Sequence, residues 1–326
     1  MSERSWLVPS IILTVGMGAT ALLLTPDYSG IMPALMLMPL WFAGCIVLGS
    51  SVGFYRMAAT RVNSPLKHIG GLLRNDRQKV LLVAFGITIA GLNMIMFMWT
   101  KPLLNYFIPF WADPALARID HMLFLGQDPW RLFDWLNTMP MAIFYHRGWF
   151  AFMIVTLLIV LAQPASPRKS ALMTTYFLLW TVAGPVIHIL LPAAGPVFFE
   201  RLGYGHQFAG IPLPEEMQKM TEFLWVFYSG ERFGPGAGIS AMPSLHIATT
   251  AWMVMAIWIY ARRWTLVMAP VGLLIFLLSI SLGWHYAIDG IVGGAAALGS
   301  YRVCLAILGA KFGAPPLRPA FNTQTA

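Results

Sequence analysis

The chain consists of long apolar stretches separated by short polar connections, from its first residues almost to its last. Eight stretches approach or exceed the roughly 18 residues that cross a hydrocarbon core of about 30 Å. They cover residues 6–25, 31–55, 80–99, 147–161, 171–191, 243–260, 265–283 and 284–308. They lack the alternation with a period of two that marks the strands of a membrane barrel. Because only helices or closed barrels satisfy backbone polar groups in lipid, the pattern predicts an all-α polytopic membrane bundle with about eight spans.

The composition and the charge distribution support this arrangement and orient it. Hydrophobic residues make up 58% of the 326 residues and charged residues only 10%. The mean hydropathy is +0.69, and this apolar content is well beyond that of a soluble domain. Placing both termini in the cytoplasm collects most of the 21 basic residues in the inner connections and leaves most of the 13 acidic residues outside. Such an excess of Lys and Arg marks cytoplasmic loops, so we expect both termini to be cytoplasmic.

The high isoelectric point of about 9.7 does not indicate a nucleic-acid partner. The basic excess belongs to short loops beside the spans, where it sets the topology and meets anionic lipid. The partner that we expect there is the membrane bilayer. The two cysteines, Cys45 and Cys304, both fall within predicted spans. We interpret them as small core residues, which predicts neither a disulfide framework nor a metal site.

We divide the chain into three parts. Residues 1–141 hold the first spans, a basic inner loop and an aromatic outer loop; residues 142–310 form a six-helix-type core region with a site on its outer face; residues 311–326 are a polar tail. The first span resembles a signal peptide, but its apolar residues continue through Leu24, so we expect an uncleaved anchor. The outer connection 192–242 is the longest, and connections of this length are usually functional.

Polar residues stand at the mouth of one predicted span, in the stretch SAMPSLHIATTAW that begins at Ser240. Pro243 suits the first turn of a helix, and Ser240 is placed to cap that helix. Ser244 alone is most simply structural. His246 is different, because an ionisable residue beside a membrane span is costly and usually marks a pathway or a site.

A second polar group, in SLGWHYAIDGIVGG from Ser281 to Gly294, follows one hairpin later. His285 and Asp289 are four residues apart, so on a helix they would share a face and the carboxylate could hold one imidazole nitrogen. The predicted topology puts this group and His246 on the same, outer side. We therefore expect two histidines and an aspartate to converge there.

This set suits nucleophilic displacement at phosphorus. A neutral histidine steered by an aspartate can attack, and a second histidine can protonate the leaving oxygen. The first turns of two helices would offer backbone donors to a phosphate. The chemistry requires neither a metal nor another cofactor. A zinc site built from the two histidines and Asp289 is the competing interpretation, but the spacing lacks a helix-paired pattern such as H-E-x-x-H.

The two groups resemble the second and third signature motifs of the type-2 phosphatidic-acid phosphatase superfamily, through Pro243-Ser244-x-His246 and His285-x3-Asp289. The resemblance implies that His285 forms a phospho-histidine, Asp289 orients it, His246 protonates the departing alcohol and Ser244 holds a phosphate oxygen. It also implies a metal-independent enzyme.

A narrower resemblance rests on three further features: Leu245 in place of the usual glycine, the pair Gly195-Pro196 upstream, and Tyr286 after His285. These are similar to the branch that contains the inositol-phosphorylceramide synthases, which are inositolphosphotransferases, and their bacterial relatives.

Two departures from the superfamily pattern concern its phosphate-binding cations. Ser279 stands where the third motif has its arginine, and the first motif, a lysine followed by Arg-Pro, is not recognisable. Our candidates for the replacement are Arg201 and Arg232 on the outer loop, with Arg147 third. Further candidates for substrate contact are His188 and Ser279, although both could instead form hydrogen bonds within the helices.

The favoured function is a lipid phosphotransferase that moves a phosphate-containing headgroup from a phospholipid donor to a lipid alcohol. The alternative is a lipid phosphate phosphatase with water as the acceptor. The missing arginine favours the transferase. A phosphodiester carries less negative charge than a phosphate monoester, and its binding should depend less on that cation. A transporter is the second alternative; it predicts ionisable groups near mid-membrane, whereas the candidate groups here gather at one face. We expect a bacterial inner-membrane protein with its site facing the periplasm.

Overall fold

The computed structural model describes residues 2–24, 31–230, 234 and 236–312, and these residues form helices and loops without a strand. Seven helical stretches are long and apolar enough to cross a membrane: Arg4–Leu24, Ile31–Ala59, Arg77–Phe107, Met139–Leu161, Pro167–Leu190, Arg262–Ser281 and Ala287–Ile307. The shorter apolar helix α13 (Leu245–Tyr260) joins them. The prediction of an all-α membrane bundle is confirmed, with seven full-length candidate spans where we expected about eight.

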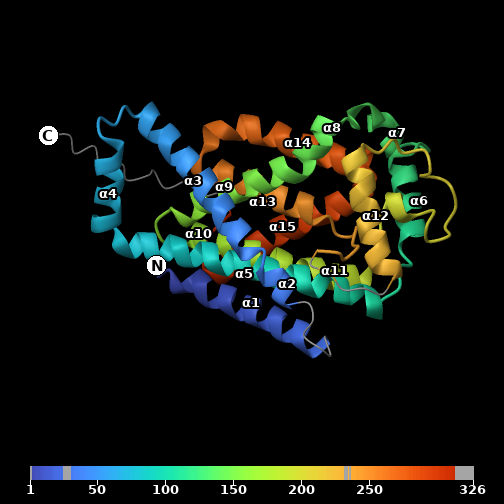
Figure 1. Cartoon of the computed structure of the whole chain (residues 1–326), viewed down its shortest axis with the longest axis horizontal. Helices are drawn as coiled ribbons and strands as arrows, with labels where there is room; N and C mark the ends of the chain where they lie inside the picture. The colour runs from blue at the N-terminus through green and yellow to red at the C-terminus, as the bar shows by residue number, and fades with distance from the viewer. Residues whose placement is uncertain (1, 25–30, 231–233, 235, 313–326) are drawn as a thin grey trace.

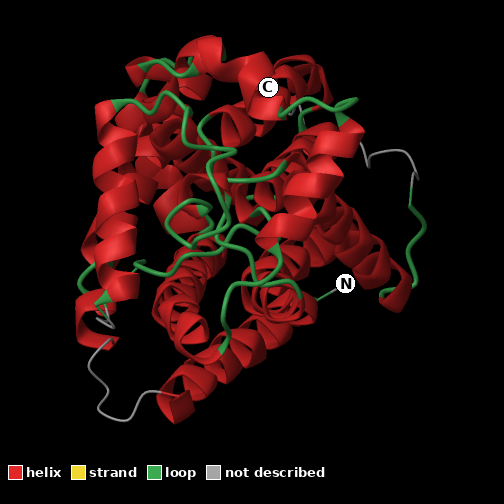
Figure 2. Cartoon of the chain, turned by 90° about the vertical axis from the view of Figure 1, so that its right-hand side faces the viewer, coloured by secondary structure: helices red, strands yellow, loops and turns green. Residues whose placement is uncertain are grey.

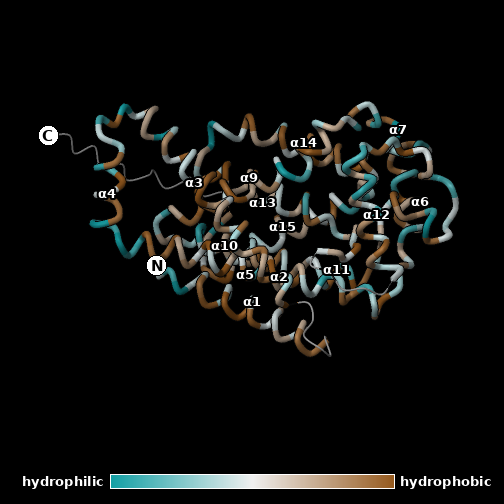
Figure 3. Tube along the Cα trace, viewed as in Figure 1, coloured by the Kyte–Doolittle hydropathy of each residue, from teal (hydrophilic) through white to brown (hydrophobic). Residues whose placement is uncertain are grey.

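The long helices run side by side along the long axis of the molecule (Figure 1). They are α1 (Arg4–Leu24), α3 (Met38–Ala59), α5 (Arg77–Phe107), α9 (Trp149–Leu161), α10 (Pro167–Leu178), α13, α14 (Thr265–Ser281) and α15 (Ala287–Ile307). The short helix α2 (Ile31–Leu35) precedes α3, and α11 (Gly184–Leu190) continues α10. Hydrophobic residues run along these helices, whereas hydrophilic residues gather at the two ends of the bundle (Figure 3). This distribution matches the requirement that polar backbone and side chains stay out of hydrocarbon.

The two ends of the bundle carry different elements. Helix α4 (Pro65–Asn75), from the basic loop, lies across one end, and α6 (Asp113–Leu123), α7 (Pro129–Phe133) and α12 (Glu215–Ser229) gather at the other (Figure 1). Figure 2 looks onto this second end, where loops cross between the surrounding helices. We call it the loop end of the bundle.

Helices α13 and α15 pack against each other at the loop end. Gly293 of α15 lies so close to α13 that a Cβ atom there would collide with the carbonyl oxygen of Ser244. The Ser244 amide also donates to the Asp289 carbonyl oxygen over 3.1 Å. The starts of the two helices are therefore held side by side, as convergence of the two motifs requires.

The start of α13 differs from the predicted one. Ser244, not Ser240, caps the helix, because the side chain of Ser244 accepts a hydrogen bond from the Ile247 amide. Pro243 consequently precedes the helix instead of occupying its first turn. The Ser240 hydroxyl pairs with His188 over 3.1 Å.

Candidate active site

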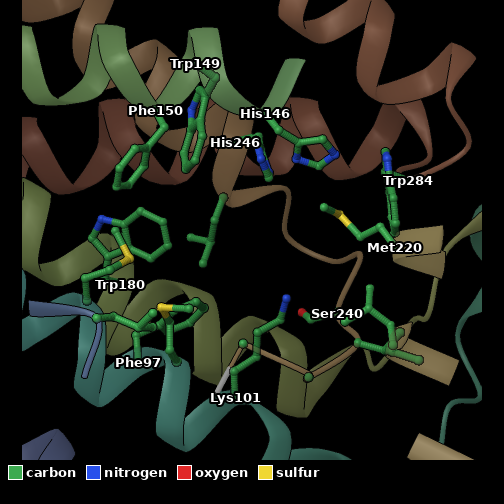
Figure 4. Close-up of a pocket in the computed structure, with 18 of the residues that line it drawn as sticks. Phe97, Lys101, His146, Trp149, Phe150, Trp180, Met220, Ser240, His246 and Trp284 are labelled. Atoms are coloured by element: carbon green, nitrogen blue, oxygen red, sulfur yellow. The ribbon is translucent and has the colours of Figure 1, made fainter. Parts of the chain in front are cut away.

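A cavity of about 530 Å³ lies between α2–α3, α5, α9, α12 and the starts of α13 and α15. This volume falls within the range of roughly 300–1,000 Å³ that is usual for ligand pockets. His246 and His285 both line it, so the structure brings together the two histidines that the sequence singled out. His146 and Lys101, which the sequence interpretation did not include, line it as well (Figure 4).

His285 lies in the loop between α14 and α15, almost fully buried. Its Nδ1 is 2.8 Å from the carbonyl oxygen of Ala241. Since a carbonyl oxygen only accepts hydrogen bonds, Nδ1 must carry the proton and Nε2 keeps its lone pair. Burial, with a smaller contribution from the Lys101 charge, lowers the pKa of His285 to about 3. The imidazole is therefore neutral near pH 7, as a nucleophile must be.

His285 and Asp289 lie close together, as predicted, but they do not share a helix. Helix α15 begins only at Ala287, because Gly283 turns the chain with a φ of +70° and Tyr286 stays extended. The Asp289 carboxylate accepts the Tyr286 amide at 2.8 Å. Its distance to His285 Nδ1 is 3.6 Å, which is too long for a hydrogen bond. The Ala241 carbonyl, not Asp289, fixes the tautomer in this geometry.

His246 is the second residue of α13 and is held between aromatic rings. It stacks on Tyr145 with ring centroids 4.8 Å apart and an interplanar angle of 16°. The ring centroid of Trp149 lies 4.1 Å from that of His246. The rings of His246 and His285 are 6.2 Å apart, so a phosphoryl group can be reached by both from one cavity.

Lys101 supplies the positive charge of the cavity. It is the one Lys or Arg among the described residues that line the cavity. Figure 4 shows it rising from α5 on the side opposite His246 and His146, with its amine beside Ser240. No acidic side chain of the described residues pairs with it. This arrangement leaves the ammonium group available to an anionic ligand.

The sequence interpretation missed Lys101 because of a helix boundary. The predicted span stopped at residue 99, which placed Lys101 in an outer loop. Helix α5 instead continues through Pro102 to Phe107, and this extension carries the lysine into the bundle. A lysine immediately after an apolar span, on the side where basic residues are scarce, was the available signal.

Two of the three arginines proposed as phosphate ligands, Arg201 and Arg147, do not line the cavity. Arg201 pairs with Glu222 at 2.7 Å and lies over the ring of Trp225. Arg147 pairs with Glu216, also at 2.7 Å, and its side chain is 72% exposed. Arg232 lies outside the described residues.

The remaining candidates make local hydrogen bonds. Ser244 is fully buried, caps α13 and does not line the cavity. The Ser279 hydroxyl donates to the Phe276 carbonyl at 2.7 Å. His188 forms a hydrogen bond with Ser240, and Ser240 lines the cavity. His188 is therefore connected to the site only through Ser240.

Two buried carboxylates of α6, Asp113 and Asp120, accept hydrogen bonds from the segments packed around His285. Asp113 accepts the amides of Ala194 and Gly195 at 2.9 and 2.8 Å and the Tyr286 hydroxyl at 3.0 Å. Burial raises its pKa. Gly195 has a φ of +101°, and a Cβ there would meet the Trp284 carbonyl oxygen at 2.5 Å. Asp113 and Asp120 belong to the aromatic outer loop of the sequence, to which the sequence interpretation assigned no role.

The second of these carboxylates, Asp120, holds the start of α15. It accepts the amides of Ala287 and Ile288 at 2.5 and 3.0 Å. These amides belong to the first turn of the helix, which has no internal partners for them. Burial raises the pKa of Asp120 to about 6. Asp120 therefore fixes the residues that directly follow His285.

One arm of the cavity is apolar. We refer to one wall of the cavity as the apolar arm. It is formed by Leu37, Leu40, Trp41, Met94, Phe97 and Phe150. The side chain of Leu40 is 72% exposed on the surface of the bundle. The arm therefore extends from the histidines to the outer surface of the helix bundle.

Several polar atoms of the cavity wall have no partner. Within the part of the chain that the structure describes, these buried atoms are Tyr145 Oη, His146 Nε2, Trp180 Nε1 and Trp284 Nε1. In the same part of the chain, no group of three or more His, Cys, Asp or Glu side chains could hold a metal ion.

Comparison with protein families gives one match, in which residues 114–303 fit the family described as the PAP2 superfamily. The match indicates no specific branch. Comparisons with curated proteins and with solved structures give no match. The matched region contains His146, His246, His285 and Asp289, whereas Lys101 and the α2–α3 side of the apolar arm lie before it.

Proposed function

The chain belongs to the PAP2 superfamily of membrane lipid phosphatases and phosphotransferases, and from that premise we propose that it is a lipid phosphotransferase. In this proposal it moves a phosphate-containing headgroup from a phospholipid to a lipid alcohol. The observation that carries the proposal is the hydrogen bond from His285 Nδ1 to the Ala241 carbonyl. It leaves a neutral imidazole whose Nε2 lone pair is free for attack.

The reaction has two steps at one phosphorus atom. His285 Nε2 attacks, a P–N bond forms, and the P–O bond to the diacylglycerol oxygen breaks while His246, in its protonated form, donates a proton to that oxygen. The hydroxyl of the acceptor then attacks the phospho-histidine and gives its proton to His246. A new P–O bond forms, and the electron pair of the P–N bond returns to Nε2. The 6.2 Å between the two rings leaves room for the phosphoryl group between them.

Lys101 binds the phosphate in place of the motif arginine that is absent at Ser279. Its ammonium faces the cavity opposite His246 (Figure 4), where it neutralises charge that develops on the phosphoryl oxygens. A single cation suits a phosphodiester, which carries one negative charge, better than a phosphate monoester, which carries up to two. This charge balance supports a transferase over a phosphatase, as does the motif resemblance to the inositol-phosphorylceramide synthase branch.

The apolar arm holds a hydrocarbon chain of the lipid substrate. The exposed Leu40 marks where the arm meets the bilayer. Helix α4, which carries Lys67 and Arg74, lies at the end of the bundle opposite α6, α7 and α12 (Figure 1). By the positive-inside rule we propose that this end is cytoplasmic, and that the site faces the periplasm of a bacterial inner membrane.

The test uses purified protein in lipid nanodiscs with two donors. One is phosphatidic acid and the other is phosphatidylinositol, each with ceramide as acceptor or with a diacylglycerol whose acyl chains differ from those of the donor. We expect a new headgroup-bearing lipid from the diester donor, little free phosphate from phosphatidic acid, and a base-stable, acid-labile phospho-enzyme. The substitution His285→Ala should abolish both the product and the phospho-enzyme. Release of phosphate from phosphatidic acid without any headgroup transfer would refute the transferase in favour of a phosphatase.

A further inference from the structure

The end of the cavity away from the apolar arm carries two unpaired nitrogen atoms. His146 and Trp284 meet there with ring centroids 5.8 Å apart and an interplanar angle of 80°. Figure 4 shows them on the side of His246 opposite Phe150 and Trp180, with the indole nitrogen turned toward His146. His146 Nε2 and Trp284 Nε1 are both buried and have no hydrogen-bond partner among the described residues.

Both side chains are held in place. His146 belongs to a π-helical segment, Phe144–Gly148, that continues into α9, and such segments are frequent at functional sites. The next residue, Arg147, ties this segment to α12 through Glu216 at 2.7 Å. The ring of Trp284 packs on Phe198 at 6.4 Å. The two nitrogens therefore keep their position at the cavity wall.

The chemistry of these two nitrogens restricts what can satisfy them. The indole N–H is a donor only, whereas a neutral imidazole nitrogen either accepts or donates according to its tautomer. Folded proteins leave few buried polar groups unpaired. A hydroxyl group can accept from the indole and donate to the imidazole, and so it satisfies both nitrogens at once. An alkyl group satisfies neither, and a phosphate oxygen satisfies both only when His146 Nε2 carries the proton.

We propose that His146 and Trp284 form a hydroxyl-binding subsite beside the phosphoryl site. This inference rests on the proposed function, which places the phosphorus between His285 and Lys101. Trp284 directly precedes His285, and the His146 ring lies 5.8 Å from that of His246. The subsite therefore recognises a hydroxyl close to the reacting phosphate, carried by the donor headgroup or by the acceptor alcohol.

The test measures binding to the full-length His285→Asn protein in nanodiscs, so that turnover does not interfere. Asn at this position keeps an N–H donor for the Ala241 carbonyl. For the donor, we compare the binding of phosphatidylglycerol with that of phosphatidylpropanol, which differ only by the headgroup hydroxyls. For the acceptor, we compare the binding of diacylglycerol with that of its O-methyl ether. We expect a preference of about tenfold for the hydroxylated member of one pair, as loss of one or two hydrogen bonds implies.

The substitutions Trp284→Phe and His146→Phe, each added to this protein, should reduce that preference to within about twofold. The matched control is Trp130→Phe, because the indole nitrogen of Trp130 is likewise buried without a partner but does not line the cavity. This control should keep the full preference. Size-exclusion profiles identify any variant that fails to fold, and the other variant then carries the test.

Two results would overturn the subsite: equal binding within both lipid pairs before any substitution at His146 or Trp284, or a preference that survives in each folded variant. The proposed function is assessed separately by headgroup transfer with the wild-type protein. Hydroxyl preference without transfer would refute only the transferase. Transfer without hydroxyl preference would refute only the subsite.

Discussion

Replacing Lys101 by methionine tests the electrostatics of the site most directly. The substitution keeps an unbranched side chain and removes the one positive charge that the described residues contribute to the cavity. A hydrogen bond to a charged group is worth about 1.5–3 kcal/mol. With about 1.4 kcal/mol per factor of ten, headgroup transfer should lose roughly 10- to 100-fold in kcat/KM. Lys101→Arg should recover part of that loss.

The assay is headgroup transfer in nanodiscs at several donor concentrations, so that kcat and KM are separated. Because charge on the phosphoryl oxygens grows in the transition state, kcat should fall and not only KM rise. The control is Lys219→Met, since Lys219 is an exposed residue of α12 that pairs with Glu215 at 2.6 Å. This control should retain activity within about twofold.

The same substitution has a pH signature. The positive charge of Lys101 helps to lower the pKa of His285, because it disfavours a second positive charge on the imidazole. Removing that charge raises the pKa of His285, so activity should begin to fall at a higher pH as the solution is acidified. An unchanged kcat/KM, or a loss no larger than that of Lys219→Met, would refute the role given to Lys101.

Three further predictions follow from the site and its supports. Because burial lowers the pKa of His285 to about 3, ¹⁵N NMR of labelled histidine should show its neutral Nδ1–H form from pH 7 down to about pH 4; titration near pH 6.5 would contradict this. Asp120→Ala removes the acceptor of two amides and should cost about 1–3 kcal/mol of stability, seen as a lower unfolding temperature in detergent. Asp76→Ala, at an exposed position beside α4, should not change that temperature. Met94→Trp narrows the apolar arm and should reduce transfer from long-chain donors more than from short-chain donors; equal losses in a chain-length series would argue against a hydrocarbon chain in the arm.

The sequence itself determined the all-α membrane bundle, because the length and hydropathy of a span are local properties of consecutive residues. It also indicated that His246 and His285 approach each other, since span counting assigns each motif to one side of the bilayer. These inferences need no knowledge of how side chains pack. They agree with seven candidate spans and with two histidines that line one cavity.

Only the tertiary structure decided how each histidine is held and where the cation lies. The spacing of His285 and Asp289 predicted a helical pair, but Gly283 turns the chain, and the Ala241 carbonyl, 44 residues earlier in the chain, bonds the imidazole instead. Helix α5 carries Lys101 past the predicted end of its span and into the cavity. Loop conformation, helix ends and hydrogen-bond partners depend on contacts between distant segments, and no local pattern of residues contains those contacts.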